Sequence, residues 1–200
     1  MVYRIFPDYP GMHRYGVKHL NGDPDKVEAL DITPDEAKIL PGYSIFAGRP
    51  VDTTHLPTKV QAGGRKRTFK DISPDGLYSV SENFREVVER LEPGVHQFVP
   101  VEFVWKDGTH AANRYWYFPC NRLDSVDREK TTEELEAGIM WMPSKNPGFV
   151  FSRSQIGDCH LWRDKFMPSS YGPFISNALY KAFVEAGIEG MGVQELPETD

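Results

Sequence analysis

An apolar alternation that runs into a tight turn constrains the fold of this 200-residue chain more than any other feature. Apolar side chains recur at every second position over residues 99–105, as in a β-strand with a buried face. Asp107-Gly108 follows, and this pair favours the turn of a β-hairpin. The return segment 115–118, Tyr-Trp-Tyr-Phe, is apolar on both faces, which is typical of a central strand. We therefore predict antiparallel strands near 97–105 and 112–120 within a sheet.

Two segments carry the signals of capped amphipathic helices. Ser81 precedes the first segment and Pro93-Gly94 ends it, whereas Ser176 precedes the second and Gly187 ends it. Their apolar residues recur at helical spacing: Phe84, Val87, Val88 and Leu91 in the first, and Leu179, Ala182, Phe183 and Ala186 in the second. We predict two helices that bury their apolar faces on one sheet.

The surroundings of these two helices are alike. Ser81 and Ser176 lie 95 residues apart, and at this offset each apolar position of the first helix has an apolar counterpart in the second. Each helix is followed by a glycine and then by a predicted strand, which contains Phe98 in one case and Val193 in the other. A repeated strand–helix–strand unit would explain the match, although any two amphipathic helices share such a pattern. Two copies are too few for a solenoid.

Other local signals predict further short elements. Strands are expected at Tyr3–Phe6, at 27–32 and at 139–142. Capping boxes at Thr33–Glu36 and at Thr131–Glu134 predict the starts of two short helices.

These elements predict an α+β fold, with a mixed or antiparallel sheet and two Ser-capped helices in a quasi-repeat. Residues 1–74 form an irregular N-terminal region with short strands and one short helix, and residues 75–200 form an α+β region. We expect the two regions to make one compact unit. A chain of this length buries roughly 70% of the surface that its unfolded form exposes, so it needs neither a metal nor a disulfide for stability.

Composition excludes several classes of protein. The chain is 40% hydrophobic and 12% aromatic, which excludes an intrinsically disordered protein. The first residues lack the apolar segment of a secretory signal peptide, and no apolar run is long enough to predict a membrane span. Cys120 and Cys159 lack metal-ligand spacing, which favours free thiols in a reducing compartment. We therefore expect a cytoplasmic protein.

The net charge of −6 is concentrated in the middle of the chain. Residues 71–140 carry 14 acidic and 7 basic side chains, whereas residues 1–70 carry 8 acidic and 11 basic ones. An acidic surface repels phosphates, so we expect no direct contact with nucleic acid and instead a basic protein partner. The candidate contacts lie in a stretch with few apolar residues: Glu129, Glu133, Glu134 and Glu136. The alternative is a solvated helix that serves solubility and lies away from the partner.

No motif predicts catalysis, a cofactor or a metal. The chain has no Walker or Rossmann glycine loop, no Gly-x-Ser-x-Gly, no His-Glu-x-x-His and no Cys-x-x-Cys. Asp158-Cys159-His160 is the densest cluster of reactive side chains, but neighbours on a strand point to opposite faces. A small hydrolase or transferase that uses Cys159 or a histidine pair stays an alternative, as does a domain that senses a small ligand.

Several stretches, taken in order, resemble a known family. They are Leu77–Phe84, Val126–Lys130, Pro143–Gly148, Ile175-Ser176 and Ala186–Met191. Their order is similar to that in immunity protein family eleven of bacterial polymorphic toxin systems, over roughly residues 75–197. The resemblance implies a cytosolic antidote, encoded beside a toxin, that protects its producer by binding that toxin. It implies no catalytic residue, and it leaves the oligomeric state open.

Overall fold

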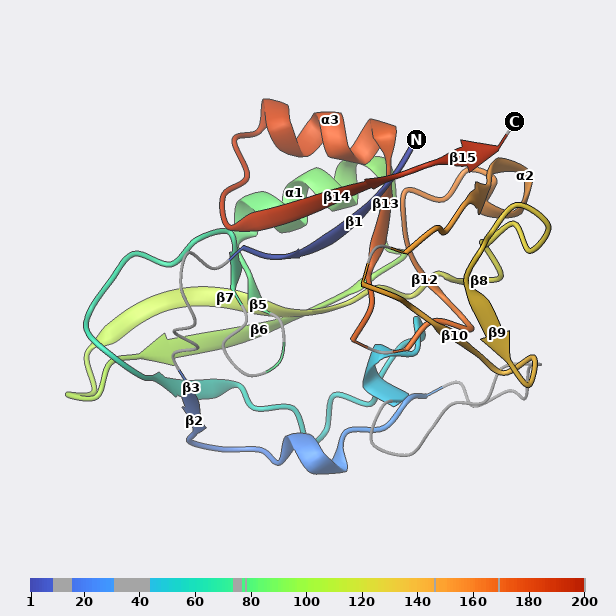
Figure 1. Ribbon diagram of the computed structural model, residues 1–200. Helices are drawn as coiled ribbons and strands as arrows, with labels where there is room; N and C mark the ends of the chain where they lie inside the picture. Colours follow the sequence, from blue (N-terminus) through green and yellow to red (C-terminus); the bar gives the residue numbers. More distant parts are fainter. Residues whose placement is uncertain are drawn as a thin grey trace.

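The computed structural model describes residues 1–8, 16–30, 44–73, 77, 79–145, 147–168 and 170–199. Two sheets and two helices dominate this part of the chain, and the two helices lie side by side (Figure 1). The combination is the α+β class with mixed and antiparallel pairing that the sequence predicts. No helix within these ranges is long and apolar enough to cross a lipid bilayer.

The strands form two large sheets and two small pairs. The larger sheet has the order β2 (Val17–His19), β3 (Lys59–Ala62), β6 (Gln97–Val104), β7 (His110–Phe118), β5 (Ser79–Val80) and β4 (Ile72–Ser73). The second has the order β14 (Met191–Leu196), β1 (Val2–Pro7), β13 (Phe174–Ser176), β12 (Leu161–Asp164) and β8 (Arg122–Leu123). The small pairs are β9 (Glu134–Glu136) with β10 (Met140–Met142), and β11 (Phe151–Ser152) with β15 (Glu198–Thr199). The helices are α1 (Glu82–Leu91), α2 (Arg153–Ile156) and α3 (Asn177–Glu185), and 3-10 turns lie at Pro24–Lys26 and Ser44–Phe46.

The predicted hairpin is confirmed. β6 and β7 pair in antiparallel fashion on either side of the Asp107-Gly108 turn. The Asp107 carboxylate accepts the N–H of Thr109 at 3.1 Å, and Gly108 adopts a φ of 82°, a left-handed conformation that favours glycine. β7 lies between β5 and β6, and both Trp116 and Tyr117 are buried although they face opposite sides of the sheet. The central position inferred from its two apolar faces is therefore correct.

Both Ser-capped helices are confirmed as well. The Ser81 Oγ accepts the N–H of Phe84 at 3.1 Å, and the Ser176 Oγ accepts the N–H of Leu179 at 3.2 Å. Each bond satisfies one of the N–H groups that the first turn of a helix leaves without an intrahelical partner.

The strands around the two helices have the same topology. In the first unit, β4, β5, α1 and β6 follow one another along the chain, and the sheet order is β6-β7-β5-β4. In the second unit, β12, β13, α3 and β14 follow one another, and the sheet order is β14-β1-β13-β12. Every neighbouring pair in both units is antiparallel. The quasi-repeat is therefore a repeat of a whole split strand–helix–strand arrangement, and not merely of two helices.

The two caps share a further detail that supports the repeat. The backbone N–H of Ser81 donates to the carbonyl of Asp71 at 2.8 Å, and that of Ser176 donates to the carbonyl of His160 at 2.9 Å. The Ser81 hydroxyl also donates to the Asp71 carboxylate, and the Ser176 hydroxyl lies 2.7 Å from Nδ1 of His160. In each unit, the residue just before the first strand thus holds the helix cap.

The apolar faces of the two helices meet each other, with a sheet behind each helix. Phe84, Val88, Leu179 and Phe183 are all fully buried, as predicted. The rings of Phe84 and Phe183 are stacked, with centroids 4.7 Å apart. α1 contacts β7 of the six-stranded sheet, whereas α3 contacts β1 and β13 of the five-stranded sheet. The prediction that both helices pack on one sheet is wrong, because each unit brings its own sheet to a shared core.

Polar bonds also connect each unit with the start of the other. The Glu92 carboxylate, at the end of α1, accepts the backbone N–H groups of His160 and Leu161, both at 2.9 Å. The Asp71 carboxylate in turn accepts the N–H of Glu189, which follows α3, at 2.8 Å. The chain after each helix therefore bonds to the residues that open the opposite unit.

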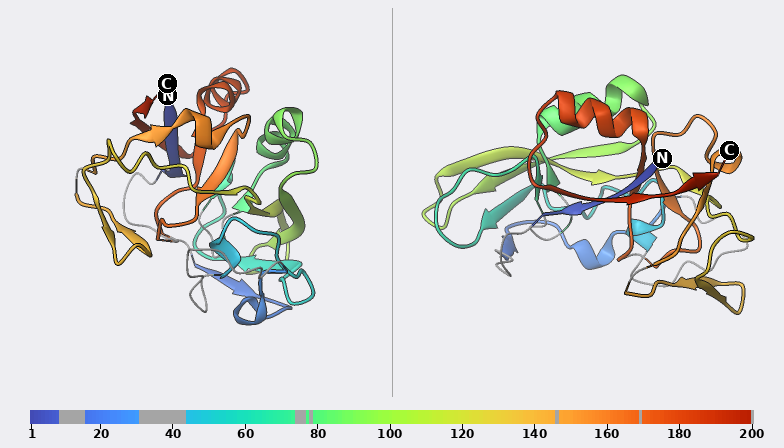
Figure 2. Two further views of the ribbon diagram at one scale, coloured as in Figure 1. Left: turned by 90° about the vertical axis from the view of Figure 1, so that its right-hand side faces the viewer. Right: turned by 45° about the horizontal axis from the view of Figure 1, so that its top comes forward.

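The N-terminal region contributes more strands than its sequence signals indicate. β1 confirms the strand predicted at Tyr3–Phe6, but β2, β3 and β4 carry only weak local signals. The described part of 27–32 is not a strand, and Ala29 forms a single bridge with Val51. The helix predicted at Thr33–Glu36 lies outside the described residues. The chain ends lie together (Figure 2), where the amino group of Met1 pairs with Glu198.

Candidate partner-binding surface

The acidic segment contains a two-stranded ribbon in place of the helix predicted from Thr131–Glu134. The Thr131 Oγ1 accepts the N–H of Val150 at 3.1 Å, so it bonds to a neighbouring strand instead of a first helical turn. Ala137 and Gly138 adopt φ angles of 50° and 71°, and a right-handed helix cannot continue through them. β9 and β10 pair across this turn, so the strand expected at 139–142 is confirmed.

The β9–β10 ribbon has one buried face and one exposed face. Leu135 lies opposite Trp141, and both pack on the aromatic core beneath the ribbon. Trp141 is only 2% exposed, and its ring meets that of Phe149 at a centroid distance of 5.8 Å. Because side chains alternate along a strand, the remaining pairs point away from the core. These outward pairs are Glu136 with Met140 and Glu134 with Met142.

Glu133 serves the loop beside the ribbon. Its carboxylate accepts the N–H and the hydroxyl of Ser144, at 2.7 and 3.0 Å, and the N–H of Gly148 at 2.9 Å. The bond from Gly148, followed by those from Ser144, holds the pKa of Glu133 below its usual value. These contacts hold Ser144 and Gly148 against the start of the ribbon, so this carboxylate has a defined structural role.

Glu129, Glu134 and Glu136 are exposed on the protein surface. Glu134 and Glu136 lie on the same outward face of β9, and Glu129 lies on the loop that precedes the ribbon. Residues 124–142 carry six carboxylates and only two basic side chains. The segment is therefore an acidic surface, of the kind that attracts a basic partner over several ångströms.

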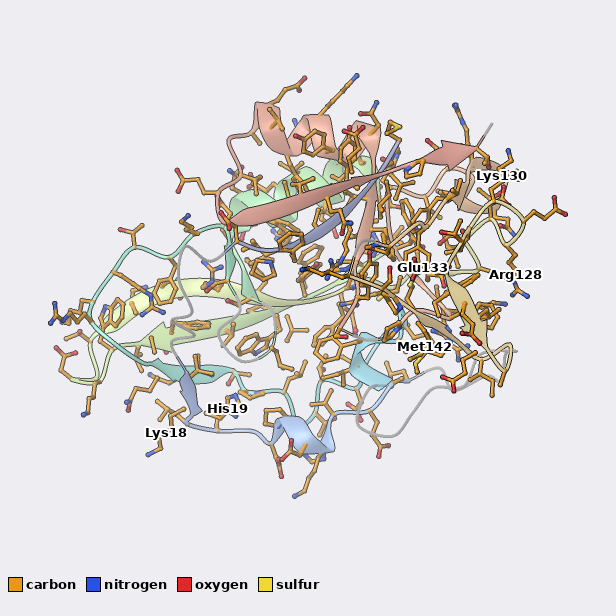
Figure 3. The ribbon with its side chains drawn as sticks, viewed as in Figure 1. Lys18, His19, Arg128, Lys130, Glu133 and Met142 are labelled. Atoms are coloured by element: carbon orange, nitrogen blue, oxygen red, sulfur yellow. The ribbon has the colours of Figure 1, made fainter. Side chains whose placement is uncertain are left out.

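The two basic residues of the segment lie on the loop next to the ribbon. Figure 3 shows Arg128 and Lys130 there, on the side of the molecule that also carries Glu133 and Met142. The Arg128 guanidinium pairs with the Asp124 carboxylate at 3.0 Å and lies 4.8 Å above the ring centroid of Phe166. A carboxylate of the protein itself thus offsets the charge of Arg128, and the ribbon keeps its acidic character.

The cluster at Asp158-Cys159-His160 does not form a catalytic arrangement. His160 bonds to the Ser176 hydroxyl, and its backbone N–H bonds to Glu92. Burial, followed by the nearby carboxylates of Glu92 and Asp158, raises the pKa of the Cys159 thiol. A raised pKa disfavours the thiolate that a nucleophilic cysteine requires. In the described ranges, no three His, Cys, Asp or Glu side chains gather closely enough to hold a metal ion.

Glu92 and His96 form a buried hydrogen-bonded pair that no sequence motif indicates. The His96 Nδ1 accepts the N–H of Cys120 at 3.0 Å, so its Nε2 carries the proton and donates to Glu92 at 2.8 Å. Burial raises the pKa of Glu92, but the bonds from His96 and from the backbone of His160 outweigh it, and the pKa lies below the usual value. Asn121 completes the set with a donor at 2.9 Å. Each Glu92 carboxylate oxygen accepts two hydrogen bonds, as expected of a buried carboxylate with a structural role.

Comparison with known proteins identifies a family. The family model described as Immunity protein family (Imm11) matches residues 10–197. The chain belongs to this family. The match covers nearly the whole chain and reaches further towards the N-terminus than the resemblance visible over residues 75–197. No curated protein that was compared matches the chain. Membership in Imm11 supports an immunity function, suggests a non-enzymatic role, and implies a toxin as the partner.

Proposed function

We propose that this protein neutralises a toxin domain in the cytoplasm by binding it directly, and that Glu129, Glu134 and Glu136 attract a basic surface on that toxin. Membership in the Imm11 family is the observation that carries the immunity function. The acidic surface at residues 124–142 supports a partner of opposite charge. Toxin domains that act on nucleic acid carry such basic surfaces, because they must bind phosphates. Opposite charges raise the rate of encounter more than they slow dissociation.

Association kinetics test this proposal. The triple variant Glu129→Lys, Glu134→Lys, Glu136→Lys reverses three exposed charges and leaves Glu133, with its loop contacts, in place. With the toxin domain encoded beside this gene, we expect association at low salt to slow at least tenfold. The defect should shrink at an ionic strength of about 0.15 M and above, where exposed charges are screened.

A matched control separates local charge from net charge. Glu28, Glu86 and Glu185 are also exposed, and Glu86 and Glu185 lie on α1 and α3 rather than on the ribbon. Reversing these three residues changes the net charge by the same amount, and we expect association to slow much less. Equal association rates for the two triple variants would show that the acidic segment does not contact the toxin. No complex between the native protein and the toxin would overturn the immunity mechanism itself.

A further inference from the structure

The outward face of the β9–β10 ribbon carries an apolar group beside its carboxylates. Ile139, at the turn, and Met142, at the end of β10, are 46% and 47% exposed. Met140 lies between them and is half-buried. The other exposed large hydrophobic residues in the described part of the chain come from separate segments: Met1, Leu20, Leu30, Val95 and Val184. In the described part of the chain, the ribbon is the one place where two exposed large hydrophobic residues, Ile139 and Met142, lie within a single turn and strand.

Acidic and apolar side chains are paired across this face. Met140 lies opposite Glu136, and Met142 lies opposite Glu134. Directly opposed side chains in an antiparallel pair have Cβ atoms about 5 Å apart, so each methionine has a carboxylate beside it. Such a face fits a partner with an apolar hollow that is bordered by lysine or arginine. Methionine is unbranched and polarisable, and it adapts to the shape of a hollow.

The ribbon is held firmly from beneath. Trp141 is buried, and its backbone N–H donates to the carbonyl of Phe166 at 2.9 Å. Glu133 bonds the start of the ribbon to Ser144 and Gly148. A face that is ordered before binding loses less conformational entropy when the complex forms. The outward side chains are therefore presented on a fixed support.

We infer that this face is where the toxin docks, with Ile139, Met140 and Met142 seated in an apolar hollow and Glu134 and Glu136 facing its basic rim. The inference rests on the proposed function, and it adds the apolar contacts that slow dissociation to the acidic ones that speed encounter. Buried apolar anchors at the centre of an interface contribute more to its lifetime than charges at its rim.

Dissociation rates test the apolar part directly. The double variant Ile139→Ser, Met142→Ser should dissociate from the toxin at least tenfold faster, with its association rate changed less than threefold. Val184→Ser is the matched control, because Val184 is 60% exposed but lies on α3. Its dissociation rate should equal that of the native protein. Unchanged dissociation of the double variant from a toxin that the native protein binds would overturn this docking face and leave the immunity mechanism intact.

Methionine oxidation gives a second test that needs no variant. Met142 and Met1 are 47% and 45% exposed, so dilute hydrogen peroxide should oxidise both in the free protein. In the complex we expect Met142 to be protected at least fivefold and Met1 to be oxidised as before. Equal oxidation of Met142 with and without toxin would overturn the inference. Protection of Met142 in the protein alone, rising with its concentration, would show that a second copy occupies this face and would overturn it too.

Discussion

The two units of this protein reach the same arrangement by different routes along the chain. In the first unit the central strand, β7, follows β6 directly across the Asp107-Gly108 turn. In the second unit the central strand, β1, comes from the opposite end of the chain, and Val2 pairs with Leu196 of β14. Bringing distant segments together costs more loop-closure entropy than closing a hairpin. The second unit therefore depends on both chain ends, whereas the first depends mainly on local contacts.

The largest expected effect comes from removing β1. Deletion of residues 1–7 takes the central strand from the second unit, together with Val2 and Ile5, which are 1% and 0% exposed. We expect the truncated protein to lose cooperative unfolding, which far-UV and near-UV circular dichroism during thermal denaturation would show. A fragment of residues 75–200 should fail in the same way, because we propose that the regions 1–74 and 75–200 form one unit.

The control for this deletion lies in the first unit. Two glycines inserted after Gly108, which has open space around its Cα, should leave the cooperative transition in place. A truncated protein with a native-like transition would contradict the dependence of the second unit on the chain end.

The next effect concerns the stacked rings at the centre of the shared core. Phe84→Ala and Phe183→Ala should each lower the free energy of unfolding by about 3–5 kcal/mol, because both rings are fully buried. The double variant should lose less than the sum, because the rings contact each other. Urea denaturation measures all three values. Strict additivity would mean that the two units unfold without this coupling.

A smaller effect is expected at Glu92, which bonds the first unit to the second. Glu92→Gln should cost about 1–3 kcal/mol at neutral pH, because each carboxylate oxygen accepts two N–H donors and the amide nitrogen that replaces one oxygen accepts neither. The pKa of Glu92 is lowered in the folded protein, so its stabilisation is complete above the unfolded value of about 4.3 and is lost as the pH falls through the folded value.

The pH dependence makes the Glu92 prediction specific. The difference in unfolding free energy between the native protein and Glu92→Gln should narrow below about pH 4.3 and stay constant above pH 6. Glu86→Gln, at an exposed position on α1, serves as the control and should change little at any pH. If the difference in unfolding free energy between the native protein and Glu92→Gln widened in acid, the pKa of Glu92 would be raised and not lowered by folding, which would contradict this prediction.

The smallest effect compares the two helix caps. Ser81→Ala and Ser176→Ala should each cost about 1 kcal/mol, the usual loss for an N-cap serine. Ser81→Ala should be the costlier of the two, because the Ser81 hydroxyl also donates to a carboxylate, that of Asp71. Thermal denaturation monitored by circular dichroism would rank them, and equal losses would show that the Asp71 bond adds nothing to the cap.

The sequence predicts the elements whose signals are local. The Asp107-Gly108 hairpin and both serine caps depend on neighbouring residues, and the structure confirms them. The separation into two sheets is invisible locally, because β1 finds its partners near the other end of the chain. The capping box at Thr131–Glu134 misleads for the same reason: Val150, far along the chain, uses the hydroxyl that would have capped a helix.

The candidate surface divides in the same way. Acidic composition indicates Glu129, Glu134 and Glu136, and the structure places all three on the surface. Composition alone cannot distinguish these three residues from Glu133, because the bonds of Glu133 to Ser144 and Gly148 depend on the fold. The outward apolar residues of the ribbon are equally hidden, because the strand predicted at 139–142 puts Met140 and Met142 on one face without indicating whether that face is buried or exposed.

Inhibition in a purified system tests the central claim, direct neutralisation, most directly. The toxin domain encoded beside this gene would be assayed for its own activity while purified native protein is added in increasing amounts, with the Ile139→Ser, Met142→Ser variant in parallel. The account predicts that the native protein abolishes toxin activity with no third component, and that the variant needs at least tenfold more protein for the same inhibition. Full toxin activity in a molar excess of folded native protein would contradict it.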